Sequence, residues 1–118
     1  MEIVIHSNNW KWGRSFDLIT DDGTGTVSVS ITNDEPEQAY ISGLSVHQSR
    51  RNQHLGSFLM KEAMRVAMKE RARYAYLMAD KDSFVFDWYK RLGFNYYGHK
   101  PDENGFVPMY ADLKTISK

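Results

Sequence analysis

The chain of 118 residues has no cysteine, only three prolines and no long hydrophobic run. Without cysteine, the protein forms neither a disulfide framework nor a thiolate nucleophile, and no metal centre with cysteine ligands. Its uninterrupted apolar segments extend over a few residues, whereas about 20 are needed to cross a bilayer. Residues 1–6 lack the basic and apolar regions of a signal peptide. We therefore expect a soluble, cytoplasmic protein.

The sequence also lacks net charge, because fifteen basic residues balance fifteen acidic ones. This balance argues against a protein that coats nucleic acid or an anionic membrane, so neither is expected as a partner. The charges are nevertheless unevenly distributed. Residues 1–46 carry seven acids and two bases, whereas residues 47–118 carry thirteen bases and eight acids. This split suggests one surface suited to an anion and another suited to a cation, although chance segregation in a short chain explains it equally well.

The hydrophobic pattern predicts a single α/β domain over residues 1–118. A composition of 42% hydrophobic and 25% charged residues is typical of a globular domain, and no linker or repeat interrupts it. The expected order is β-β-β-β-α-β-α-β-β, a mixed and largely antiparallel sheet. The predicted strands are Glu2–His6, Ser15–Thr20, Gly25–Thr32, Ala39–Val46, Tyr74–Ala79, Asn95–Gly98 and Phe106–Leu113, and the predicted helices are Leu55–Arg71 and Ser83–Leu92.

Several single residues refine this prediction. Gly43 interrupts the fourth strand, which often indicates a bulge or a close approach to the backbone. Met60, Met64 and Met68 widen the apolar stripe of the first helix and are interpreted as core residues rather than as a cofactor site. The connection from Ser7 to Gly13 is too short for a helix.

The segment between the fourth strand and the first helix predicts an anion site. It contains Arg50 and Arg51 and leads into the helix start at Leu55. Free backbone N–H groups and the positive end of the helix dipole attract an anion at such a junction. Gly56 would let a phosphate approach the backbone without an intervening side chain.

Two motifs of this sequence resemble the GNAT superfamily of N-acetyltransferases. Residues 51–56, Arg-Asn-Gln-His-Leu-Gly, resemble the family's Arg/Gln-x-x-Gly-x-Gly/Ala loop, preceded by a Leu-x-Val-x stretch at residues 44–47. Residues 88–94, Trp-Tyr-Lys-Arg-Leu-Gly-Phe, resemble the family's Phe-Tyr-x-x-x-Gly-Phe segment. Residues 107–113 are similar to the usual last strand. The resemblance covers about residues 39–113.

The resemblance implies a GNAT-like sheet splayed between the fourth and fifth strands, with acetyl-CoA as the co-substrate in that gap. The usual helices after the first strand are missing. His54 departs from the family's glycine and would either crowd the pyrophosphate or donate a hydrogen bond to it; alternatively, the site has lost its cofactor. The implied cofactor-binding residues are Leu44, Ser45, Val46, Arg51, Asn52, Gln53, His54, Leu55, Gly56 and Ser57.

Tyr89 occupies the position where the family often has a general acid, and a phenol near the departing thiolate can donate the required proton. The alternative is a tyrosine packed beneath the second helix among Phe84, Phe86 and Trp88. Asp82 stands where the family frequently has an asparagine that contacts pantetheine. Since a carboxylate cannot donate a hydrogen bond as an amide does, a helix N-cap is the simpler interpretation of Asp82.

The general base cannot be identified from the sequence. Asp34, Glu37 and His47 lie near the fourth strand, and a chain of water molecules would serve as well. The four histidines lack metal-ligand spacing, so no metal site is predicted. Trp10 and Trp12 either wall the acceptor site in place of the missing helices or anchor the core, which is the simpler interpretation of each. A second chain, as in a homodimer, would also complete such a wall.

The leading hypothesis is an N-acetyltransferase that transfers acetyl directly to a primary amine of a peptide, protein or polyamine. Because no cysteine is present, transfer within a ternary complex is more natural than a thioester on the enzyme. The alternative is a non-catalytic GNAT-like module that binds CoA or a partner protein. Binding of single-stranded nucleic acid through the basic half is weakly supported, because Arg73-Tyr74 enters a buried strand.

Overall fold

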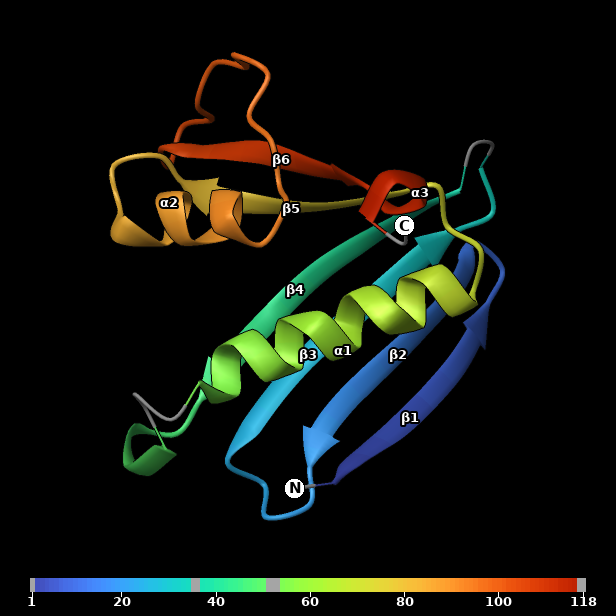
Figure 1. Cartoon of the computed structure of the whole chain (residues 1–118). Helices are drawn as coiled ribbons and strands as arrows, with labels where there is room; N and C mark the ends of the chain where they lie inside the picture. The colour runs from blue at the N-terminus through green and yellow to red at the C-terminus, as the bar shows by residue number, and fades with distance from the viewer. Residues whose placement is uncertain (1, 35–36, 51–53, 117–118) are drawn as a thin grey trace.

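The computed structural model describes residues 2–34, 37–50 and 54–116, and it confirms a mixed α/β fold (Figure 1). No helix within these ranges is both long and apolar enough to cross a membrane. The strands are β1 (Ile3–Trp10), β2 (Gly13–Thr20), β3 (Gly25–Thr32), β4 (Gln38–Val46), β5 (Tyr74–Asp80) and β6 (Phe106–Asp112), and the helices are α1 (Leu55–Lys69), α2 (Phe84–Arg91), the short α3 (Leu113–Ile116) and the 3-10 turn η1 (Gln48–Arg50).

The first two strands form a longer hairpin than the sequence predicts. β1 continues to Trp10, which pairs with Gly13 across a two-residue turn, so the expected connection at 7–13 is mostly strand. β1 is an edge strand with both faces largely exposed, and therefore its polar half carries no alternating pattern. Gly13 lies so close to β3 that a Cβ atom there would stand 2.0 Å from the carbonyl oxygen of Ile31.

All six strands lie in one sheet in chain order, and only β4 and β5 are parallel neighbours. Their pairing begins at Gln38 and Tyr74 and ends after Tyr40 and Tyr76. Beyond that point β4 stays paired with β3, and β5 stays paired with β6. The two strands therefore diverge, as Figure 1 shows. The splay that the family resemblance implied is present in this sheet.

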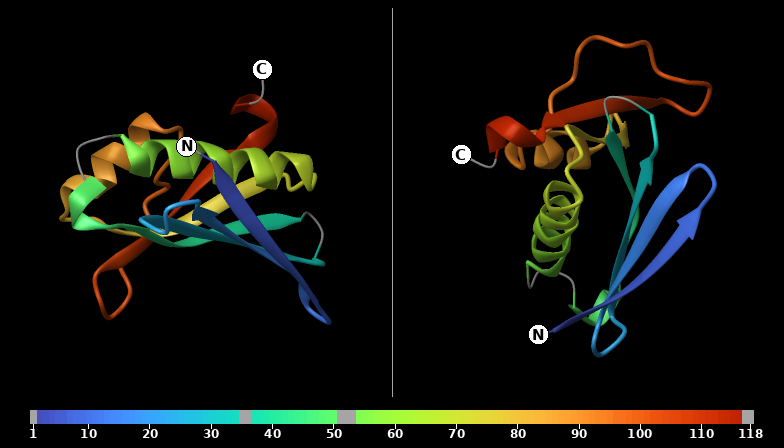
Figure 2. Two further views of the ribbon diagram at one scale, coloured as in Figure 1. Left: turned by 90° about the horizontal axis from the view of Figure 1, so that it is seen from below. Right: turned by 90° about the vertical axis from the view of Figure 1, so that its right-hand side faces the viewer.

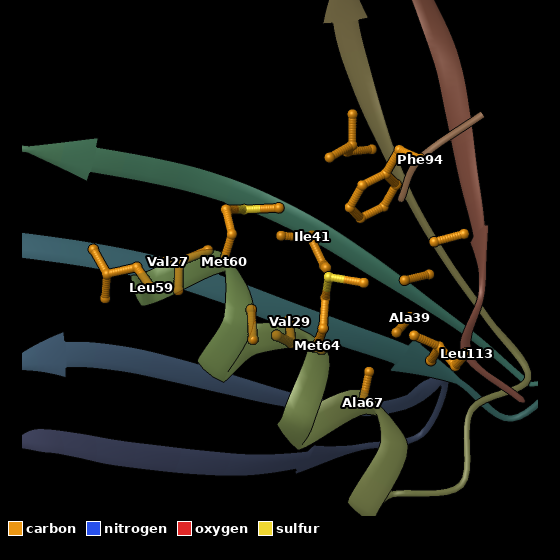
Figure 3. Close-up of a cluster of buried hydrophobic side chains, with 14 of the residues drawn as sticks. Val27, Val29, Ala39, Ile41, Leu59, Met60, Met64, Ala67, Phe94 and Leu113 are labelled. Carbon is orange, nitrogen blue, oxygen red and sulfur yellow. The ribbon is translucent and has the colours of Figure 1, made fainter. Parts of the chain in front are cut away.

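One face of the sheet is covered by α1 and α2. The side chains of α1 point toward β3 and β4, as Figure 3 shows for Leu59, Met60 and Met64. The predicted core role of Met60 and Met64 is confirmed by their burial. At Gly25 an added Cβ would lie 2.8 Å from Cδ1 of Leu59, so α1 packs directly on the β3 backbone. The opposite face of the sheet carries no described helix (Figure 2).

The end of α1 differs slightly from its predicted boundary. The helix stops at Lys69, two residues before the predicted Arg71. Arg71 has a left-handed backbone, with φ of 66°, and the N–H of Ala72 donates back to the carbonyl of Ala67 at 3.0 Å. This pattern of bonds terminates helices in the Schellman manner.

The C-terminal part corrects two predicted strands. Residues 95–98 form no strand, because only Asn95 bridges to Tyr110 and the hydroxyl of Tyr96 donates to the carbonyl of His99 at 2.7 Å within a loop. The last strand ends at Asp112 rather than Leu113. The carboxylate of Asp112 accepts a bond from the N–H of Lys114, and Leu113 turns into the core as the first residue of α3.

Candidate active site

A pocket of about 250 Å³ lies where β4 and β5 diverge. Its lining comes from both faces of the sheet. Ile41 and Leu77 belong to the helix-covered face, whereas Tyr40 and Met78 alternate with them and belong to the helix-free face. The pocket therefore lies in the gap between the strands and is bordered by residues of both faces. Its full lining is Tyr40, Ile41, Ser42, Gly43, Leu44, Met60, Leu77, Met78 and Tyr89.

The wall of this pocket contains the bulge that Gly43 predicted. The β3–β4 register shifts between Thr26 and Ser28, so Gly43 and Leu44 together stand opposite Val27. Gly43 has φ of 66°, a left-handed conformation that suits glycine. The bulge lies in the part of β4 that no longer pairs with β5. Beyond it, no described strand pairs with Leu44, Ser45 or Val46 on the side that faces β5, so their backbone edge there suits an extended ligand.

The start of α1 lies after the same strand. The first helical hydrogen bond joins the N–H of Phe58 to the carbonyl of His54, so the N–H groups of Leu55, Gly56 and Ser57 precede the intrahelical ladder. A Cβ at Gly56 would lie 3.7 Å from the Trp88 ring, an ordinary contact. Backbone donors with little side-chain cover suit a phosphate group. The predicted residues Arg51, Asn52 and Gln53 lie outside the described residues.

His54 gives a physical reason for the glycine that the family has at this position. It has φ of 59° and ψ of 18°, and its side chain makes no cap hydrogen bond. A left-handed backbone costs a residue with a Cβ atom roughly 1–2 kcal/mol, whereas glycine adopts it freely. His54 thus adopts a conformation that favours glycine despite its side chain.

Arg50 fixes the loop before α1 to the β2–β3 turn. Its Nη1 lies 2.8 Å from the Oδ2 of Asp22. Hydrogen bonds from the side chain and backbone of Thr24 are the main cause that lowers the pKa of Asp22 to about 2, and Arg50 contributes further. The positive charge of Arg50, which the sequence analysis placed at the anion site, is therefore partly balanced by Asp22.

Tyr89 projects from α2 into the pocket between the diverging strands. Its ring packs against Trp88, at 5.1 Å between centroids, and against Phe94, at 6.2 Å. Burial raises the pKa of the Tyr89 phenol above its usual value. The hydroxyl therefore keeps its proton at neutral and moderately alkaline pH. Tyr89 therefore packs against the aromatic residues around α2 and also lines the pocket between β4 and β5.

The side chains considered as general bases have other partners. The carboxylate of Glu37 accepts a bond from Nη2 of Arg14 at 3.1 Å, and the ring of His47 lies 2.8 Å from the hydroxyl of Ser49. Asp34 is exposed, and neither it nor the other two lines the pocket. The interpretation of Asp82 as a helix cap is wrong: Ser83 is the N-cap of α2, and its hydroxyl accepts from the N–H of Val85.

The expectation that Trp10 and Trp12 anchor the core is also wrong. Their side chains are 51% and 48% exposed, and the two rings stack at 6.2 Å. They lie at the tip of the β1–β2 hairpin because the two-residue turn places both rings outside the sheet interior. This position leaves them free to contact a substrate or partner.

Comparisons with known proteins agree with this geometry. The model of the Acetyltransferase (GNAT) family matches residues 8–94. No curated protein sequence matches the chain at a significant level.

Solved structures with the same fold share little sequence with this chain. A GNAT family acetyltransferase from Elizabethkingia anophelis with acetyl-CoA bound is 14% identical, with a TM-score of 0.66 over 93% of this chain and 97% of that one. The NatC complex bound to Gag peptide and CoA contains a chain that is 14% identical, with a TM-score of 0.70 over 83% and 70%. A ribosomal-protein-alanine N-acetyltransferase from Escherichia coli is 16% identical, with a TM-score of 0.64 over 89% and 72%.

Proposed function

Because the chain belongs to the Acetyltransferase (GNAT) family, we propose that it transfers acetyl from acetyl-CoA directly to a primary amine of a peptide, protein or polyamine. The observation that carries this proposal is the pocket between β4 and β5, which is bordered by residues of both faces of the sheet and by Tyr89. A pocket in the gap between two diverging strands would let a thioester and an amine meet beside Tyr89, as direct transfer in a ternary complex requires.

The residues around the pocket fit acetyl-CoA. The backbone of Leu44, Ser45 and Val46 offers an unpaired strand edge to the amide groups of pantetheine, and the first N–H groups of α1 suit the pyrophosphate. When bound, the cofactor supplies an activated acetyl group. The protein would hold the pantetheine arm along β4 and the pyrophosphate at the start of α1.

Tyr89 serves as the proton donor in this proposal. Its phenol remains protonated because burial raises its pKa, and it faces the space where the leaving sulfur would lie. The pocket lining contains no carboxylate or imidazole among the described residues. The proton of the incoming ammonium group therefore leaves through water, and we expect activity to rise above neutral pH as more of the amine becomes neutral.

Thermal unfolding in the presence of acetyl-CoA tests cofactor binding. At a hundred times its dissociation constant, the cofactor is expected to stabilise the fold by about 2.7 kcal/mol, which shifts the melting temperature by several degrees. Gly56→Glu is expected to abolish this shift, because a carboxylate would then stand against the phosphates. Lys69→Glu is the control, since it makes the other end of α1 more negative by two charges, twice the change at Gly56, and is expected to keep the shift. No shift with the native chain at millimolar cofactor contradicts the proposal.

A non-catalytic module that binds CoA is the second candidate function. It is favoured by one observation, namely that no described side chain in the pocket is a general base. Such a module would show the thermal shift and lack turnover with every amine.

A further inference from the structure

A row of three tyrosines crosses the helix-free face of the sheet. Tyr40 of β4, Tyr76 of β5 and Tyr110 of β6 are register partners, and their rings stack at centroid distances of 4.9 and 5.8 Å. Burial, followed by the neighbouring Tyr40 and Tyr110, raises the pKa of Tyr76. The three stacked rings form a continuous aromatic surface across the strands.

This tyrosine row joins two pockets. At one end Tyr40 lines the pocket between β4 and β5. At the other end Tyr110 lines a second pocket of about 430 Å³, and the rings of Tyr97 and His99 approach it to 6.2 and 6.0 Å. The row thus leads from an open surface pocket to the proposed site of transfer. The second pocket is lined by Gln38, Tyr74, Tyr97, Tyr110 and Asp112.

The strands give this face an acidic character. Strand alternation places Asp17, Asp80 and Asp112 on the helix-free side. Arg14 is the one Lys or Arg within the six described strands, and it lies on the other side, where it binds Glu70 at the end of α1. Asp112 is paired with Arg73. A cation that approaches the tyrosine row therefore meets aromatic faces, with Asp112 and its partner Arg73 at the outer pocket.

The protein already contains one cation in such a position. The guanidinium of Arg73 lies 5.2 Å from the centroid of Tyr74 while it pairs with Asp112. A cation over a tyrosine face beside a carboxylate is therefore an arrangement that this pocket accommodates. The larger space next to it, bordered by Tyr97 and Tyr110, is open to a cation from outside.

Two projections flank the helix-free face. In the left view of Figure 2, the loop that leads to β6 and the tip of the β1–β2 hairpin extend away from the helices. The loop carries Tyr97, which is 66% exposed, and the hairpin tip carries Trp10 and Trp12. An extended ligand can lie between these projections along the tyrosine row.

We propose that the tyrosine row and its outer pocket bind a second cationic group of the acceptor, which positions the reacting amine at the Tyr40 end. This inference rests on the proposed acetyl transfer and specifies its substrate class: a chain that carries an ammonium or guanidinium group in addition to the amine that is acetylated. A linear polyamine and a basic peptide segment share this chemistry. Recognition relies on cation–π contacts, because the charge of Asp112 is already paired.

The test measures cation binding without any acetyl transfer. Choline and its neutral isostere 3,3-dimethylbutan-1-ol are titrated into protein with isotope-labelled tyrosine rings, and ring resonances are followed by NMR. Choline is expected to bind at least about fivefold more tightly than the neutral isostere and to shift the resonances of the tyrosine row. Equal affinity for the two probes, or shifts confined to other tyrosines, overturns the inference.

Two variants make the result specific. Tyr97→Leu is expected to weaken choline binding about threefold. Because Tyr97 is exposed, the substitution is expected to have little effect on stability. Phe84→Leu is the control, because Phe84 is an exposed aromatic on α2 outside the row, and it is expected to leave binding unchanged. An equal loss in both variants contradicts a specific site.

Spermidine and the peptide Gly-Gly-Lys-amide then distinguish the two sources of the cation. Tighter binding of spermidine indicates a polyamine acceptor, tighter binding of the peptide indicates a basic segment, and failure of both to exceed the neutral isostere overturns the inference. Choline needs no cofactor to bind. If acetyl-CoA shifts the melting temperature but choline does not bind, the inference is wrong and the proposed function stands. If choline binds but acetyl-CoA gives no shift, the proposed function is wrong.

Discussion

Tyr89→Phe is expected to lower turnover by about 10²-fold or more and to leave acetyl-CoA binding nearly unchanged. The change removes only the hydroxyl, so the ring contacts with Trp88 and Phe94 remain. The magnitude is that of a general acid that no longer protonates its leaving group. Steady-state turnover and the thermal shift with acetyl-CoA, measured on the same preparations, separate the two effects.

The pH profile adds a second readout for Tyr89. Since burial raises the phenol's pKa above its usual value, the native enzyme is expected to gain activity from neutral pH upward and to lose it only in strongly alkaline solution, where the phenol ionises. Tyr96→Phe is the matched control, because the Tyr96 hydroxyl bonds to the His99 carbonyl outside the pocket. Turnover in Tyr89→Phe equal to that of the control would assign Tyr89 to packing and leave solvent as the proton source.

Gly13→Ala is expected to destabilise the fold by roughly 3–5 kcal/mol, the largest effect on stability that we predict. The new methyl group would stand 2.0 Å from the carbonyl oxygen of Ile31, and the surrounding atoms are backbone that cannot rotate away. Either β1–β2 separates from β3 or the strands distort. Urea unfolding followed by circular dichroism measures the loss.

Gly23→Ala separates steric overlap from backbone strain. Gly23 also has a positive φ, of 75°, but nothing lies within 4 Å of an added Cβ. We expect it to cost about 1 kcal/mol from strain alone. If Gly13→Ala and Gly23→Ala lower the free energy of unfolding equally, the steric overlap between β2 and β3 does not contribute to the cost at Gly13.

The parts of the fold that the sequence predicted are those with a buried face. β3 has the predicted bounds because its apolar residues alternate against α1, and α1 begins at the predicted Leu55 because its stripe starts there. Burial imposes a period that the sequence displays. The bulge at Gly43 was predicted because glycine is the residue that such a conformation favours.

The parts that the sequence failed to predict lack such a period. Residues 7–10 of β1 lie on a sheet edge with both faces exposed, and residues 95–98 contact β6 through one bridge. Neither segment needs alternating side chains. The exposure of Trp10 and Trp12 was missed because large aromatic residues are usually buried, and only the two-residue turn places them outside.

The candidate site was predicted in part. The motifs placed Leu44 and Tyr89 in one pocket and Gly56 at the start of α1. The tyrosine row was not predicted, because its members come from three strands whose register the sequence does not specify. Alternation within each strand put Tyr40, Tyr76 and Tyr110 on defined faces, but only the sheet order brings them together.

Incubation of the protein with labelled acetyl-CoA and a panel of amines tests the central claim most directly. The panel includes basic, neutral and acidic peptides, spermidine and simple monoamines. We expect acetylation of basic acceptors, faster above neutral pH because more of the amine is neutral, and slower with added salt because salt screens the attraction of a cationic acceptor to the protein. A protein that shows the acetyl-CoA thermal shift yet acetylates no member of the panel contradicts the claim and favours the non-catalytic module.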